Sequence, residues 1–296
     1  MRKKDSTYQI KILIAVEAFQ FFTRILRSAL IFTNPDLQIA SLFQEDVFGF
    51  SLRIASALCN VLVCILITNF YLDKLMAEHQ KSAHAIENGM LDSLNALSMV
   101  RDNETGNHIL RTKNYVEAIA NRLKSLGIYK EELSAEAICN MTKAAPLHDI
   151  GKVGIQDDIL KKKGSLTDEE WVVMKTHPFL GEEVLKAAKV EDARHTKVLD
   201  AAIDIAGGHH EAWDGTGYPR GLRGHDIPLS ARIMSVADMY DALVSERVYK
   251  KKWSHEDACA EIARLKGSRF DPVIVEAFLM ERENFIRIAD LYKDEA

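Results

Sequence analysis

The sequence predicts an all-α protein, in which a helical bundle follows two hydrophobic N-terminal helices and a linker helix. Three segments indicate helices: a long apolar run at residues 47–72, an amphipathic stripe at residues 73–101, and a helical stretch from Ser134 to Ala145. Apolar side chains at steps of three and four share one face of a helix. We expect hydrophobic helices at residues 1–72, a linker at 73–100 and a domain at 87–293.

The composition fits a folded protein with a buried core. Of the 296 residues, 47% are hydrophobic and 27% charged, which excludes a disordered chain, and 15 glycines and 6 prolines are too few for a fibrous one. The 38 basic and 43 acidic side chains give a net charge of −5, so no broad basic surface for a DNA or RNA polymer is expected. The four cysteines include no CxxC pair and predict free thiols.

The first 72 residues contain two hydrophobic segments. Val47 to Leu72 has 19 apolar residues out of 26, and Ile54 to Tyr71 carries no charge. A helix of about 20 apolar residues is long enough to cross a bilayer. The earlier segment, Ile10 to Phe32, is interrupted by Glu17, Arg24 and Arg27, which makes it a poor spanning helix on its own.

The charge distribution favours a membrane hairpin. The start Met-Arg-Lys-Lys is typical of a cytoplasmic end, and the domain after Leu72 is expected in the cytoplasm, so the number of crossings should be even. We therefore expect residues 1–72 to form a hairpin in the cytoplasmic membrane, with an outer loop near residues 34–46. The alternative is a cytoplasmic protein whose N-terminal helices form a soluble sensor or dimerisation domain.

Residues 73–100 predict one continuous linker helix. Apolar side chains recur mostly at three- and four-residue steps, as Ala83, Ile86, Met90, Leu94 and Leu97 illustrate. A packed linker would explain this stripe. A parallel homodimer through the same face, passing a signal to the domain beyond, is the second interpretation.

Candidate metal ligands gather in the domain that follows. The run LHDIGK at residues 147–152 places an imidazole beside a carboxylate, a pair that suits Zn, Mn or Fe better than Ca. Glu104 and His108 lie four residues apart, so one helical turn would bring them to one face. The full set is Glu104, His108, His148, Asp149, His177, His209, His210 and Asp238. These eight exceed the needs of one ion, so we expect two or three divalent ions with Asp149 as the bridging carboxylate.

Six motifs in this order resemble the HD-GYP family, a branch of the HD phosphohydrolases. They are RDNETGNH at 101–108, LHDIGK at 147–152, THP at 176–178, HHEAWDGTGYP at 209–219, ADMYDALVSERVYK at 237–250 and GSRFDP at 267–272. The resemblance covers about two-thirds of the chain, residues 87–293, and its specificity comes from the combination of HHExxDGxGYP with HDxGK. It implies an HD-type helical bundle with the HD-GYP extension.

The resemblance implies a phosphodiesterase for cyclic di-GMP, a bacterial second messenger. The family hydrolyses it to linear pGpG through a metal-activated hydroxide at an iron or manganese centre, and further cleavage to GMP is left open. The family's metal ligands match His148, Asp149, His177, His209, His210 and Asp238, while Glu104 matches a ligand of some members and favours a third ion together with His108. Nucleotide contacts match Lys152, Tyr218, Arg247 and Lys250, and Asp149 and Lys152 are the expected catalytic residues.

The departures from the family pattern are mild. Gln156 and Lys163 stand where proline is common, and Val248 replaces a proline, but no ligand is lost. Two alternatives stay open: a non-catalytic cyclic di-GMP receptor, and an HD hydrolase acting on another cyclic dinucleotide.

Residues near the predicted ligands have expected roles of their own. The loop from Gly215 to Pro219 is a candidate docking site for diguanylate cyclase (GGDEF) domains, as in related proteins. We expect Asp214 and Asp241 to accept hydrogen bonds that orient a ligand histidine or Lys152. Trp213 is expected to serve packing.

Overall fold

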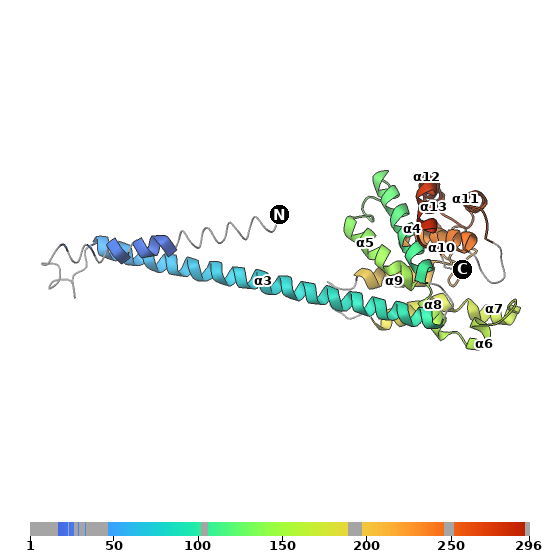
Figure 1. The fold of residues 1–296 in the computed structure, drawn as a ribbon, viewed down its shortest axis with the longest axis horizontal. Helices are drawn as coiled ribbons and strands as arrows, with labels where there is room; N and C mark the ends of the chain where they lie inside the picture. The colour runs from blue at the N-terminus through green and yellow to red at the C-terminus, as the bar shows by residue number, and fades with distance from the viewer. Residues whose placement is uncertain are drawn as a thin grey trace. The chain divides into compact units, whose positions relative to one another are not determined.

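The structure, a computed structural model, describes residues 17–22, 24–26, 29, 33, 47–101, 106–188, 197–245 and 252–293. It divides into two compact units, residues 1–86 and 87–296. Helices make up the regular structure of the described residues, and no β-strand occurs among them (Figure 1). The prediction of an all-α fold is confirmed.

The long helix α3, Val47–Arg101, contains both the second hydrophobic segment and the linker. Residues 17–22 and 24–26 of the first hydrophobic segment are helical, whereas the expected outer loop at 34–46 lies outside the described residues. One helix in the described part, within Arg53–Leu97, is long and apolar enough to cross a membrane. Length and composition alone support that statement.

The second unit is a bundle of helices that follows α3. Its α-helices are α4 Gly106–Ser125, α5 Ala135–Ala144, α6 Asp157–Leu160, α7 Asp168–Met174, α8 His177–Ala187, α9 Lys197–Gly208, α10 Leu229–Val244, α11 His255–Arg264, α12 Pro272–Met280 and α13 Arg282–Leu291. Three short 3₁₀ helices join them: η1 Ala145–Leu147, η2 Ile150–Gly154 and η3 Gly224–Asp226.

One hydrophobic core runs through this bundle, with α4 and α10 at its centre. Tyr115 of α4 stacks on Phe285 of α13, with ring centroids 4.3 Å apart, and meets Tyr240 of α10 edge-on at 5.3 Å. Leu91, near the end of α3, is buried in the same core. The core therefore holds α4 and α10 together, and both helices carry predicted ligands.

Local sequence explains how the chain reaches the His148–Asp149 pair. Ser134 caps α5, accepting a hydrogen bond from the Ala137 amide at 3.0 Å, and this confirms the helical stretch predicted before the pair. Gly151 then lets η2 pack directly on α8, because a Cβ at this position would lie 1.9 Å from the carbonyl oxygen of His177. The glycine of the LHDIGK run thus brings Asp149 close to His177.

Candidate metal centre

Seven predicted ligands converge from five places in the bundle. His108 lies in the first turn of α4, His148 and Asp149 between η1 and η2, His177 at the start of α8, His209 and His210 just after α9, and Asp238 on α10. Their ligand atoms form two groups, each with all atoms within 4.8 Å of one another: Asp149, His177, His209 and His210 in one, and His108, His148 and Asp238 in the other.

Backbone carbonyls fix the tautomer of three of these histidines. The Nδ1 atoms of His148, His177 and His209 lie 2.8–3.0 Å from carbonyl oxygens three or four residues earlier. Because a carbonyl oxygen only accepts hydrogen bonds, Nδ1 carries the proton in each ring. The lone pair of the neutral ring is then on Nε2, the atom that faces Asp149. Metal-binding histidines are oriented in this way.

Asp149 presents one carboxylate oxygen to each group. Its Oδ1 lies 3.1 Å from His177 Nε2 and 3.7 Å from His209 Nε2, and its Oδ2 lies 3.2 Å from His148 Nε2. Lys152 Nζ lies 2.7 Å from Oδ2. Burial opposes ionisation, but the Lys152 ammonium beside it holds the pKa of Asp149 well below its usual range. An ionised carboxylate with its oxygens so divided can bridge two cations.

The donor set fits divalent metal ions. Burial lowers the pKa of His209, and burial together with His209 and His177 lowers that of His210 further, so both rings are neutral near pH 7. The Nε2 atoms of His177 and His209 make no hydrogen bond of acceptable geometry, although both are buried. Lone pairs of nitrogen and oxygen that converge in a buried space repel one another unless a cation lies among them. Imidazole with carboxylate suits zinc, iron and manganese.

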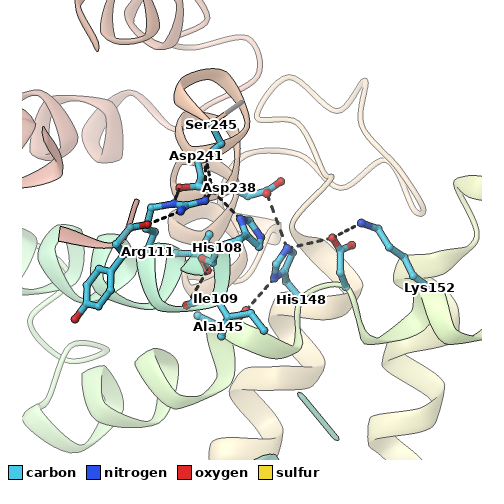
Figure 2. A network of polar contacts seen from close by, with 12 residues as sticks. His108, Ile109, Arg111, Ala145, His148, Lys152, Asp238, Asp241 and Ser245 are labelled. Atoms are coloured by element: carbon cyan, nitrogen blue, oxygen red, sulfur yellow. Dashed lines mark hydrogen bonds and ion pairs between the residues drawn. The ribbon is translucent and has the colours of Figure 1, made fainter. Parts of the chain in front are cut away.

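The second group is held from behind by a carboxylate (Figure 2). Asp241 Oδ2 lies 2.8 Å from His108 Nδ1, which turns His108 Nε2 away from Asp241. The expectation that Asp241 orients a ligand histidine agrees with this geometry. The same expectation is wrong for Asp214, because its Oδ1 accepts hydrogen bonds from the amide and hydroxyl of Thr216 and so closes its own loop.

Tyr218 and Lys175 form one wall beside the first group. The Tyr218 ring stacks on the His210 ring at a centroid distance of 4.8 Å, and Lys175 Nζ lies 5.6 Å from the Tyr218 centroid. Burial raises the pKa of Tyr218 to about 12, so its hydroxyl keeps its proton near pH 7 and can donate a hydrogen bond. Sequence reasoning missed Lys175, whose position two residues before His177 was the available signal.

Glu211 shapes the loop that carries Tyr218. It is buried, and its two carboxylate oxygens accept hydrogen bonds from the backbone amides of Arg220 at 2.8 Å and Leu222 at 2.9 Å. Gly217 packs so closely on Glu211 that a Cβ there would lie 2.5 Å from Glu211 Cα. Sequence reasoning quoted Glu211 within a motif but gave it no role. Trp213, as expected, is a packing residue that meets His225 edge-on.

Three predicted site residues, Glu104, Arg247 and Lys250, lie outside the described residues. The structure brings together the other predicted ligands and places Lys152 and Tyr218 beside them. All four cysteines are free, in agreement with the sequence.

This chain is similar to one known protein family and to several curated proteins. The model of the HD domain matches residues 98–274. A probable cyclic di-GMP phosphodiesterase of Vibrio cholerae is 48% identical over 227 residues, 77% of this chain and 52% of that protein. A cyclic di-GMP phosphodiesterase of the same organism is 49% identical over 234 residues, 78% of this chain and 46% of the relative. A V. cholerae 3′3′-cGAMP-specific phosphodiesterase is 42% identical over 188 residues, 64% of this chain and 33% of that protein.

The chain spans about half the length of the first two of these curated relatives and a third of the last. The family match covers more than half of this chain and includes every described candidate ligand. The motif order and the helical fold agree with it. The chain therefore belongs to the HD domain family.

Proposed function

We propose that this chain is a metal-dependent phosphodiesterase that hydrolyses cyclic di-GMP to linear pGpG, with further cleavage to GMP left open. The observation that carries the proposal is the pair of ligand groups on either side of Asp149. Two relatives at 48% and 49% identity bear the name of this activity. Two or three divalent ions, iron or manganese, are the proposed cofactors.

Bound divalent ions would supply a hydroxide at neutral pH and neutralise charge on the attacked phosphate. Asp149 would hold such ions through both oxygens, because it is ionised and faces both groups. Lys152 would place a positive charge at the same edge, since its ammonium lies 2.7 Å from Asp149 Oδ2. That charge is well placed to stabilise a developing negative oxygen on the substrate.

Substrate contacts would come from the rim of the centre. Tyr218 offers a protonated hydroxyl and part of a flat ring, suited to a phosphate oxygen or a guanine face. Lys175 adds a cation on the same wall. Arg247 and Lys250 are proposed as further phosphate contacts from the family motif, three residues apart in the sequence.

The experiment is an assay of the full-length protein, purified without oxygen, on cyclic di-GMP with Mn(II) or Fe(II). Products are separated by chromatography, and metal is counted in parallel. We expect turnover with two or three ions per chain, and its loss in His148→Ala and Asp149→Ala. His79→Ala, an exposed position on α3, is the control and should keep full activity. Turnover that survives both ligand substitutions would refute the proposal.

A second candidate substrate follows from the 3′3′-cGAMP-specific relative at 42% identity. Metal and phosphate contacts are common to both cyclic dinucleotides, so the described site does not separate them. A competition assay with equimolar cyclic di-GMP and 3′3′-cGAMP would give the ratio of their kcat/KM values. Tight binding of either nucleotide without turnover, at full metal occupancy, would favour the receptor alternative.

The proposal includes a membrane hairpin at residues 1–72, with the HD domain in the cytoplasm. The apolar helix within Arg53–Leu97 supports one crossing. Cys64 is exposed on this helix and Cys139 is exposed on the HD domain. In intact membrane vesicles with their cytoplasmic side outward, a charged thiol reagent should label Cys139 and spare Cys64. Equal labelling, or recovery of the protein in the soluble fraction without detergent, would favour the soluble alternative.

Two partners are proposed. A homodimer through the linker helix is supported by exposed apolar side chains at helical spacing on α3, among them Met76, Ile86 and Leu97. Sedimentation of the full chain and of Ile86→Lys would test it, because a charge on the shared face should dissociate a dimer. A diguanylate cyclase (GGDEF) domain docked on the loop from Gly215 to Pro219 is the second, testable by co-purification with such a domain.

A further inference from the structure

We infer that Arg111 is a positioning residue for the metal ligand His108, and that it acts through Asp241. The inference rests on the proposed function, because it concerns the metal ion that the second ligand group would hold. Arg111 stands one helical turn after His108 on α4 and belongs to none of the six sequence motifs.

Arg111 grips Asp241 with two parallel hydrogen bonds. Its Nε donates to Asp241 Oδ1 at 2.6 Å, and its Nη2 donates to Asp241 Oδ2 at 3.0 Å. Both side chains are almost fully buried, with exposed fractions of 4% for Arg111 and 1% for Asp241. A bidentate guanidinium–carboxylate contact fixes the carboxylate in the plane of the guanidinium group. Asp241 is thereby kept ionised and immobile.

The oxygen that Arg111 holds is also the one that His108 uses. Asp241 Oδ2 accepts from His108 Nδ1 at 2.8 Å and from the Ser245 hydroxyl at 3.2 Å (Figure 2). With its Nδ1 proton engaged there, His108 directs Nε2 toward the space shared with His148 and Asp238. If Asp241 turned, the His108 ring would turn with it. Arg111 therefore determines where the His108 lone pair points.

Further hydrogen bonds anchor Arg111 itself. Its Nη1 donates to the carbonyl oxygen of Tyr292 at 2.7 Å, just beyond the end of α13, and its Nη2 donates to Ser245 Oγ at 3.0 Å, just beyond the end of α10. Three helices thus converge on one guanidinium. A lysine could supply the charge but not this set of directions, because its ammonium is a point charge on a flexible stem.

The chain contains a matched control for a purely structural role. Arg232 and Asp271 form a second buried ion pair, 2.5 Å between Nη1 and Oδ2, with exposed fractions of 5% and 0%. Arg232 also donates to the carbonyl oxygen of Ile227 and to Tyr129 Oη. Among the described contacts, none joins this second pair to a candidate ligand. Loss of either arginine should cost stability, but only loss of Arg111 should alter metal binding.

The test compares Arg111→Gln and Arg111→Lys with the matched controls Arg232→Gln and Arg232→Lys in the full-length protein. Each variant is loaded with Mn(II), desalted and analysed for metal per chain, and Mn(II) affinity is measured by titration. We expect Arg111→Gln to hold one ion fewer than wild type, or to bind its weakest ion about 10–100-fold less tightly, as is typical when the partner of a metal-binding histidine is lost. Arg111→Lys should recover part of that affinity, and Arg232→Gln should match wild type.

The outcomes distinguish a failure of the proposed function from a failure of the role assigned to Arg111. Wild-type protein that binds neither Mn(II) nor, under exclusion of oxygen, Fe(II) would refute the proposed function. Wild-type binding with an unchanged count and affinity in Arg111→Gln would leave that function standing and overturn the role of Arg111. If Arg111→Gln does not fold, Arg111→Lys carries the test, and an affinity equal to that of Arg232→Lys would overturn the inference.

Discussion

Replacing Glu211 by Gln should loosen the loop that carries Tyr218 and lower the stability of the HD domain. The Glu211 carboxylate accepts two backbone amides, one on each oxygen, and its exposed fraction is 3%. Glutamine has nearly the same shape, but its NH₂ group can only donate. One of the two amides, that of Arg220 or that of Leu222, would then face a donor and lose its acceptor.

The magnitude follows from those two hydrogen bonds. A hydrogen bond to a charged group contributes about 1.5–3 kcal/mol, and a buried amide without an acceptor costs about 1–3 kcal/mol. Glu211→Gln should therefore lower the free energy of unfolding by about 2–3 kcal/mol, and Glu211→Ala by about 3–6 kcal/mol because both acceptors are lost. For a domain of roughly 200 residues, about 2–3 kcal/mol corresponds to a fall in Tm of about 5–10 °C.

Thermal unfolding followed by circular dichroism would measure this difference. Glu183→Gln on α8 is the control, because its side chain is 52% exposed and its ion pair with Lys186 lies at the surface. That substitution should change the free energy of unfolding by less than about 0.5 kcal/mol. If Glu211→Gln unfolds at the same temperature as Glu183→Gln, the two amide contacts do not support the loop and the reasoning fails.

Three further predictions concern metal, packing and thiols. Adding Mn(II), at about 100 times the Kd for Mn(II), to chelator-treated protein should stabilise the fold by about 2.7 kcal/mol per site and raise the Tm. The same addition should raise the Tm of His148→Ala by less. Equal shifts in Tm would contradict the assignment of His148 as a ligand. Gly151→Ala should lower the free energy of unfolding by about 3 kcal/mol or more, because its Cβ would meet the backbone of α8. Gly89→Ala, where a Cβ has nothing within 4 Å, should not lower it. Chemical denaturation measures both values. Iodoacetamide should modify exposed Cys139 faster than Cys259, because burial raises the pKa of the Cys259 thiol, and mass spectrometry that found the reverse order would refute this.

The sequence allows prediction of the features that short-range chemistry controls. Ser134 is a helix N-cap in a local pattern, so the helix that leads to the His148–Asp149 pair could be placed from the residues alone. The candidate ligands could be named because imidazoles and carboxylates are rare together in such density. Their division into two groups around Asp149 depends on the packing of α4, α8, α9 and α10, and no spacing in the chain shows it.

Arg111 was missed for a physical reason. Arg111 and Asp241 are 130 residues apart, and an arginine on a helix ordinarily faces water. The sequence suggested that Asp241 orients a histidine, but it also suggested this for Asp214, because both are carboxylates near a motif. The structure separates them: Asp241 is buried against His108, whereas Asp214 closes the turn at Thr216. Only the tertiary fold determines which acid faces the site.

The ligands and the residues behind them have opposite effects on the metal-free fold. Neutral imidazoles and an ionised Asp149 buried close together add repulsion and desolvation that no hydrophobic contact removes. Arg111, Glu211 and the carbonyls that accept from Nδ1 make satisfied hydrogen bonds and hold the same side chains in place without an ion. The fold can therefore keep the ligands oriented before metal arrives, and metal binding then relieves the repulsion among them. The stability of this domain should therefore depend on metal. Substitution of a ligand should reduce that dependence most, and substitution of a residue that orients a ligand should reduce it less.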